Sequence, residues 1–140
     1  MRSMLVSLAA LGLSLFGMAL YGAKGFEKAD SRVFELRTYY CPAGKMDALQ
    51  ARFRDHTCKL FEKHHMTIIG FWNPTDAEQA QQKLVYLLAF PSRQAAAQSW
   101  KDFQADPEWK AVKEASEKNG KLVERVESVY LNATDYSPLK

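Results

Sequence analysis

The order in which two hydrophobic periods alternate along the chain most constrains what it can fold into. Residues 33–40 (VFELRTYY) alternate from side to side with the β-branched and aromatic content of a strand, and residues 46–64 step by three and four, as a helix does. Two apolar segments, 66–76 and 83–90, then indicate a second and a third strand, and 121–131 indicates a fourth.

The segment between the third and fourth strands carries its own start and stop signals. Ser92 is suited to cap a helix, and Asp106-Pro107 supplies a second cap followed by a proline at the first helical position. Asn119-Gly120 ends the second piece. We therefore expect a helix broken in two at Asp106, while the polar residues 76–82 form a hairpin loop between the second and third strands.

The resulting order, β-α-β-β-α-β, defines an α+β, ferredoxin-like fold with an antiparallel four-stranded sheet and both helices on one face. The opposite face of the sheet is then bare. Because an apolar sheet face exposed to water is costly, we expect it to pack on the same face of a second copy. The pattern thus predicts a homodimer in the form of a dimeric α+β barrel.

An uncharged N-terminal run gives information on localisation rather than on the fold. The first 23 residues carry one charge, Arg2. At ~1.5 Å per residue the run can cross a hydrocarbon core of ~30 Å. We interpret residues 1–23 as a signal peptide or an N-terminal membrane anchor, 24–32 as a linker and 33–140 as the domain. The protein is then exported, periplasmic or secreted, or is membrane-anchored if the leader is retained; only an uncleaved leader would touch the membrane.

Charge and spacing argue against nucleic-acid and metal binding. The formal net charge is +3, but two of the 19 basic residues, Arg2 and Lys24, lie in the first 24 residues, which leaves 17 basic against 16 acidic residues from Gly25 onward. A nucleic-acid surface is not indicated. His56 and His64 are eight helical residues, ~12 Å, apart, and His64 and His65 diverge by about 100°. We expect no metal site and no cofactor.

Five ordered blocks resemble the NIPSNAP family over nearly all of residues 33–138. They are FELRTYYCPAGKMDALQARFRDHTCKLFEKH, GFW, LVYLLAFPS, FQADPEWK and VESVYL. The resemblance implies a ferredoxin-like dimeric barrel but little chemistry, because eukaryotic members are tied to mitochondria and vesicle traffic and bacterial members are mostly uncharacterised. His65 stands where such sequences usually carry a glycine, which leaves the geometry of the turn after the first helix open.

His56 is the residue on which the predicted site depends. It lies in the apolar stripe of the first helix, between Phe53 and Leu60, which aims it between helix and sheet. Two readings stay open: a core histidine bonded to a tyrosine or a backbone carbonyl, or the polar end of a pocket. In the second reading His56, Tyr39 and Tyr86 are the catalytic candidates. The predicted ligand pocket consists of Arg37, Tyr39, His56, Trp72, Tyr86 and Trp100.

Two classes of function follow from these residues. The first is an exported homodimer that binds a small aromatic or carbonyl ligand, or serves assembly, without chemistry of its own. The alternative is a cofactor-independent oxygenase or isomerase of the dimeric barrel type, with His56 as general base; haem held by His56 or His64 is a variant of it. Glu35 and Arg37 share a strand face, where we expect an Arg–Glu pair across the dimer interface.

Overall fold

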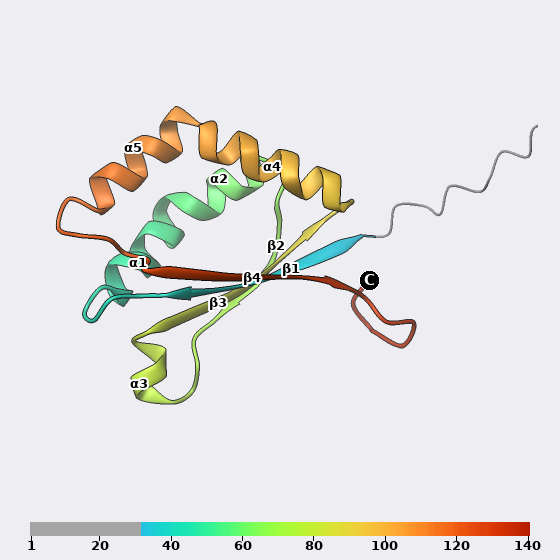
Figure 1. The fold of residues 1–140 in the computed structure, drawn as a ribbon, viewed down its shortest axis with the longest axis horizontal. Helices are drawn as coiled ribbons and strands as arrows, with labels where there is room; N and C mark the ends of the chain where they lie inside the picture. Colours follow the sequence, from blue (N-terminus) through green and yellow to red (C-terminus); the bar gives the residue numbers. More distant parts are fainter. Residues whose placement is uncertain (1–31) are drawn as a thin grey trace, which may run out of the picture.

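A four-stranded antiparallel sheet carries the helices on one face (Figure 1). The computed structural model describes residues 32–140, so the predicted leader and most of the linker lie outside the described residues. The strands are β1 (Val33–Tyr40), β2 (Thr67–Trp72), β3 (Lys83–Phe90) and β4 (Arg125–Asn132), in the order β2-β3-β1-β4. The α+β, ferredoxin-like fold predicted from the sequence is confirmed.

The helical layer has two parts that both lie above the sheet in Figure 1. The first part consists of α1 (Met46–Arg52), η1 (Phe53–Thr57) and α2 (Cys58–Lys63), and the second of α4 (Arg93–Ala105) and α5 (Pro107–Ser116). Within residues 32–140, no helix has the length and apolar content that a membrane crossing requires.

The strand boundaries follow the sequence closely in the centre of the sheet and less closely at its edges. β1 and β3 begin and end as predicted. β2 stops at Trp72, and the side-chain amide of the next residue, Asn73, donates to the backbone carbonyl of Lys83 at 2.9 Å. The connection that follows contains a short helix, α3 (Ala77–Ala80), capped by Asp76, rather than a plain hairpin loop. β4 begins at Arg125 instead of 121, because the chain first buries Leu122.

A π-helical turn, η1, interrupts the first helix and corrects the predicted burial of His56. The amide of Cys58 donates to the carbonyl of Phe53, five residues back, and the Thr57 hydroxyl donates to the carbonyl of Arg52 at 3.2 Å. This wider turn holds one more residue than an α-helical turn. The buried stripe therefore passes through Thr57, which is 2% exposed, and His56 is exposed. The prediction that His56 lies between helix and sheet is wrong.

The turn after α2 has the geometry that usually selects glycine. His65 has φ = 60°, in the left-handed region. The amide of His65 donates to the carbonyl of Glu62, and the amide of Met66 to that of Phe61, which is the hydrogen-bond pattern of a Schellman motif. His65 thus adopts a backbone conformation in which glycine is favoured, and it carries a side chain there.

His65→Gly is expected to raise the free energy of unfolding by about 0.5–1 kcal/mol. Removing the left-handed strain of a non-glycine residue gains ~1–2 kcal/mol, from which the added entropy of glycine in the unfolded chain subtracts ~0.4–1 kcal/mol. Urea denaturation measures the change. His65→Ala keeps the strain and serves as the control; a glycine variant no more stable than the alanine variant would contradict this account.

Asp106 fastens the two parts of the helical layer to each other. It caps α5 by accepting from the amide of Glu108 at 2.8 Å, which confirms the predicted break of the helix. Its Oδ2 also accepts from Lys63 Nζ at 2.8 Å and from His64 Nε2 at 2.7 Å. The hydrogen bonds from Lys63 and then His64 hold the pKa of Asp106 well below its ordinary range.

The contribution of Asp106 to stability is expected to disappear in acid. The unfolded chain takes up its proton first, near the ordinary pKa of about 4, so the contribution is complete above that pH and is lost as pH falls toward the lower folded-state pKa. Asp106→Asn should be less stable than wild type at pH 7 and approach it at low pH. Urea denaturation at pH 7, 4 and 3 measures this, with the exposed Asp102→Asn as the control. Equal pH slopes in wild type and Asp106→Asn would refute it.

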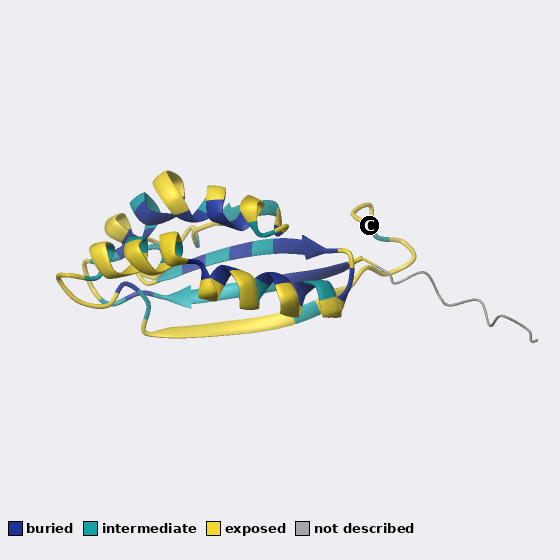
Figure 2. Ribbon diagram, turned by 90° about the horizontal axis from the view of Figure 1, so that it is seen from above, coloured by how far each residue is buried: buried dark blue, intermediate teal, exposed yellow. Residues whose placement is uncertain are grey.

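The face of the sheet opposite the helices is apolar and open. Two neighbouring rows run across it, Leu87-Leu36-Val129 and Ala89-Phe34-Leu131. Val129 is 52% exposed and Trp72, on the same face, is 51% exposed. Figure 2 shows β4 exposed along most of its length. At one end of the same face, the paired residues Tyr40 and Arg125 form a polar row, in which Arg125 lies over the ring of Tyr40. In the second row Phe34 and Ala89 are buried, so the open apolar part of this face consists of the Leu87-Leu36-Val129 row with Leu131 and Trp72.

Candidate functional site

A buried carboxylate organises the helix side of β1. Glu35 is 1% exposed. Its Oε1 accepts from Arg37 Nη1 at 2.8 Å and from the Ser128 hydroxyl at 2.6 Å, and its Oε2 accepts from the indole of Trp100 at 2.6 Å. The Arg–Glu pair expected across a dimer interface is therefore wrong in its placement: the pair lies within one chain, because odd-numbered residues of β1 face the helices.

Arg37 lies between the carboxylate and an aromatic wall. Its Cζ is 4.1 Å from the ring centre of Trp100 and 5.6 Å from the ring centre of Tyr39. Burial is the largest influence and lowers the pKa of Arg37, but Tyr86, Tyr39 and Glu35 together outweigh it and raise the pKa above its ordinary value. Arg37 is thus a permanent cation, and its buried Nε has no hydrogen-bond partner among the described residues.

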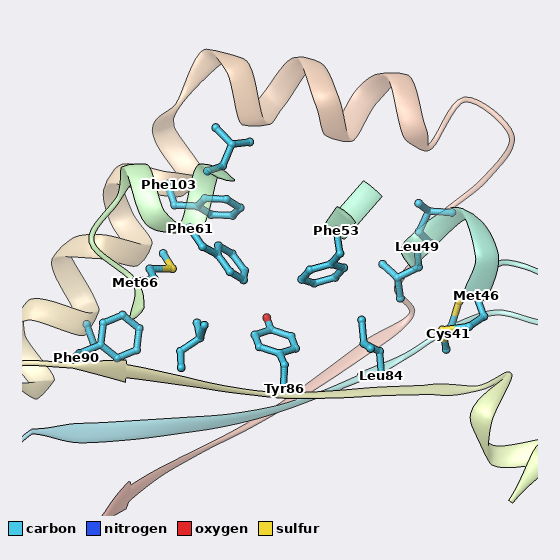
Figure 3. Close-up of a cluster of buried hydrophobic side chains, with 14 of the residues drawn as sticks. Cys41, Met46, Leu49, Phe53, Phe61, Met66, Leu84, Tyr86, Phe90 and Phe103 are labelled. Carbon is cyan, nitrogen blue, oxygen red and sulfur yellow. The ribbon is translucent and has the colours of Figure 1, made fainter. Parts of the chain in front are cut away.

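Tyr86 stands at the centre of the core. Its ring lies 5.2 Å from that of Tyr39 and 5.5 Å from that of Phe53. Figure 3 shows its hydroxyl pointing away from the sheet, toward the space between Phe53 and Phe61. Within residues 32–140 this fully buried hydroxyl has no hydrogen-bond partner. Burial, with the neighbouring Tyr39, raises the pKa of Tyr86 well above its ordinary value, so Tyr86 stays neutral and can donate a proton in a hydrogen bond but not accept one as a base.

A cleft of about 270 Å³ opens beside Tyr39, between β1, β4 and α5. We call it the β1–α5 cleft; it is lined by Tyr39, Arg52, Trp109, Lys113, Glu117, Lys121, Val123 and Val126. Three of these side chains are cationic and one is acidic. Tyr39 belongs both to this lining and to the buried aromatic group around Tyr86. The cleft is therefore the point at which the buried polar residues of β1 approach the surface.

Arg52 supplies the buried charge of the cleft. Its side chain is 4% exposed, and its Nη1 donates to Glu117 Oε1 at 3.1 Å and to the Ser116 hydroxyl at 3.3 Å. Its Cζ lies 5.2 Å from the ring centre of Trp109. The Nε is buried and has no partner among the described residues. The Nη1 of the guanidinium thus has hydrogen-bond acceptors, whereas its Nε has none among the described residues.

The predicted pocket residues fall into two groups. Arg37, Tyr39, Tyr86 and Trp100 come together on the helix side of the sheet. His56 instead lines another, open groove between the first helix and α5, of about 580 Å³, which shares Arg52 with the β1–α5 cleft but not Tyr39. Trp72 lies on the opposite face of the sheet, beyond a register shift between Ile68 and Gly70. The structure does not bring His56 or Trp72 to the other four residues.

The sequence analysis missed Arg52, Lys113 and Lys121. A signal for Lys113 was present, because Trp109, Lys113 and Glu117 are spaced four apart and so share one face of a helix. No periodicity pointed to Arg52, which precedes the π-helical turn, where the regular helical pattern fails.

Metal and haem sites receive no support from the geometry. Between residues 32 and 140 there is no group of three or more His, Cys, Asp or Glu residues that could hold a metal ion. The Nε2 of His64, one of the two haem-ligand candidates, is hydrogen-bonded to Asp106.

Comparison with known proteins identifies relatives of this fold. The NIPSNAP family model matches residues 34–138. A NIPSNAP family protein of unknown function from Agrobacterium tumefaciens is 22% identical with a TM-score of 0.68, over 79% of this chain and 96% of that chain. An uncharacterized NIPSNAP domain protein from Burkholderia xenovorans is 23% identical with a TM-score of 0.64, over 76% of this chain and 98% of that chain.

A more distant structure shares the fold under another name. A protein described as a putative antibiotic biosynthesis monooxygenase, from Bacteroides thetaiotaomicron, is 15% identical with a TM-score of 0.50, over 80% of this chain and 96% of that chain. At these identities the likeness concerns the fold alone. No match was found among curated proteins.

Proposed function

The chain belongs to the NIPSNAP family, and from this premise we propose that it is a homodimeric small-molecule-binding protein whose ligand lies in the β1–α5 cleft. The observation that carries the proposal is the lining of that cleft. It combines apolar walls with a few converging charged groups, which is the usual composition of a ligand site. Buried donors without acceptors are rare in folded proteins, and Arg52 places one beside the cleft.

Dimerisation is supported by the open face of the sheet. Two rows of apolar side chains cross it, and Val129 and Trp72 remain about half exposed in the single chain. Packing this face on its own copy would remove the apolar surface from water, and a two-fold axis lets the same rows meet. The β1–α5 cleft lies on the other side of the sheet, so each subunit of such a dimer keeps its cleft accessible.

Native mass spectrometry of protein purified from its own host tests the proposal directly, because a retained ligand adds a defined mass to each subunit. Val126→Trp should fill the cleft and abolish the added mass while the protein stays folded. Glu124→Trp adds the same bulk to an exposed residue outside the cleft and should retain it. A ligand that persists in Val126→Trp would place the binding site elsewhere and contradict the proposal.

The oxygenase or isomerase alternative has no comparable observation behind it. His56, its proposed general base, is exposed and lines a different groove from Tyr39. Tyr86, whose pKa is raised by burial, is neutral near pH 7. The structural likeness to a protein named as a monooxygenase concerns the fold.

Export is a separate part of the proposal. The uncharged run that follows Arg2 supports it, since a run of this length suits a signal peptide or an anchor. N-terminal sequencing of the mature protein is expected to begin near residue 24 in a soluble extracellular or periplasmic fraction. An intact Met1 in a soluble cytoplasmic fraction would refute export, whereas an intact Met1 in the membrane fraction would identify an anchor.

A further inference from the structure

We propose that the ligand of the β1–α5 cleft is a small organic monocarboxylate with an apolar body, and that Arg52 binds its carboxylate. The inference rests on the proposed function and adds the chemical class of the ligand. It follows from three properties of the cleft: its charge, the Arg52 Nε that has no acceptor, and the apolar side chains that line the same cleft.

The charge of the cleft favours an anion. Arg52, Lys113 and Lys121 contribute three positive charges and Glu117 one negative charge, so the lining carries an excess of two positive charges. Glu117 is already engaged by Arg52 Nη1 at 3.1 Å. The two lysines are exposed at the cleft and their charges are not balanced by other acidic residues of the lining. An entering anion would therefore be attracted, whereas a cation would be repelled.

The geometry of Arg52 favours a carboxylate over other anions. A guanidinium presents its donors in a planar fork that can hold a carboxylate through two parallel hydrogen bonds. In Arg52 the Nη1 side is occupied by Glu117 and Ser116, while Nε has no acceptor. A ligand carboxylate that reached the Nε edge from the cleft would supply the missing acceptor. Because Arg52 is buried, this charge-assisted hydrogen bond would be little weakened by water.

The remaining lining accommodates an apolar body of limited size. Trp109, Val123 and Val126 line the cleft with Tyr39. The volume of about 270 Å³ lies below the ~300–1,000 Å³ typical of sites for drug-sized molecules. A fully hydrated anion such as inorganic phosphate would gain nothing from the apolar walls. An aromatic or short aliphatic monocarboxylate uses both parts of the lining.

The test titrates ¹⁵N-labelled, full-length mature protein with benzoate, benzamide and inorganic phosphate. Benzamide has the shape of benzoate without its charge. The chain has three tryptophans, and their indole signals can be assigned with Trp→Phe variants. We expect benzoate to shift the indole signal of Trp109, which lines the cleft, and not that of Trp72, on the opposite face. Benzoate should bind at least tenfold more tightly than benzamide, and its affinity should fall as NaCl is raised.

Charge variants identify the groups responsible. Arg52→Lys keeps the charge and most of the packing but loses the fork, and should weaken benzoate binding at least tenfold. Lys113→Gln and Lys121→Gln should each weaken it severalfold. Lys110→Gln removes an equivalent exposed charge from α5 outside the cleft and should have no effect. If Arg52→Lys fails to fold, the two lysine variants and the salt dependence still decide the outcome.

The outcomes separate this inference from the proposed function. Equal binding of benzamide and benzoate at Trp109, or an equal effect of phosphate, would overturn the carboxylate assignment and leave small-molecule binding intact. A neutral ligand that is retained from the host and lost in Val126→Trp would likewise overturn the carboxylate assignment and leave small-molecule binding intact. If no probe shifts Trp109 at millimolar concentration, the carboxylate assignment fails; if host protein also carries no ligand, the proposed function fails with it.

Discussion

Glu35→Ala is expected to lower the free energy of unfolding by about 3–5 kcal/mol, a large part of the ~5–15 kcal/mol that stabilises a domain of this size. The substitution removes a buried acceptor that is bonded to Arg37, Ser128 and Trp100 at once. It leaves Arg37, whose side chain is 16% exposed, as a largely desolvated charge without its partner, and that uncompensated charge dominates the cost. Urea denaturation followed by tryptophan fluorescence measures the change.

Two further variants separate the charge from the hydrogen bonds at this position. Glu35→Gln retains an acceptor for Trp100 or Ser128 and should cost less than Glu35→Ala. The double variant Glu35→Leu with Arg37→Met removes both charges together and should recover most of the loss, because an apolar pair of similar volume avoids the desolvation of both ions. A loss below ~1 kcal/mol in Glu35→Ala would show that the buried pair is not a stabilising centre.

Val129→Asp is expected to convert the proposed dimer to a monomer at micromolar concentration. The side chain is half exposed in the single chain, so an aspartate there leaves the fold of the subunit intact. In a two-fold dimer the substitution places two carboxylates in one apolar interface, and charges without partners there cost several kcal/mol. We expect dissociation to increase at least ~100-fold, which corresponds to ~3 kcal/mol. Size-exclusion chromatography with light scattering measures it.

Val126→Asp is the matched control for this experiment. Val126 is 41% exposed and lies on the same strand as Val129, but on the face that lines the β1–α5 cleft. It should leave the dimer intact and weaken the binding of benzoate, whereas Val129→Asp should do the reverse. A wild-type protein that is monomeric at micromolar concentration, or a Val129→Asp protein that remains dimeric, would refute the sheet-to-sheet dimer.

Local signals account for the parts of the fold that were predicted well. β1 and β3 could be placed to the residue because their patterns are bounded by a cysteine-proline turn, a polar loop and a proline. Ser92 and Asp106 accept hydrogen bonds from amides two or three residues further along the chain. The capping of α4 and α5 can therefore be predicted from short stretches of sequence. Neither feature requires knowledge of distant contacts.

The candidate site was predicted only in part, because its remaining contacts join distant segments. The alternation of β1 correctly placed Glu35, Arg37 and Tyr39 on one face. The other hydrogen bonds to Glu35 come from Trp100 and Ser128, which lie 65 and 93 positions further along the chain. The pattern of β1 alone could not predict them. The burial of His56 was predicted wrongly, since a helical period of 3.6 residues was applied across a turn that does not obey it.

The π-helical turn also affects how residues should be matched between this chain and its relatives. A relative that lacks the additional residue within Phe53–Thr57 would have a regular α-helix, rotated by about 100° on one side of that point relative to the other. An ungapped alignment would then pair Arg52 with a residue that faces away from the cleft. This could happen even if the aligned residue of the relative were also an arginine. Transfer of a ligand preference within the family therefore requires the hydrogen-bond pattern of this helix to be compared before its residues are.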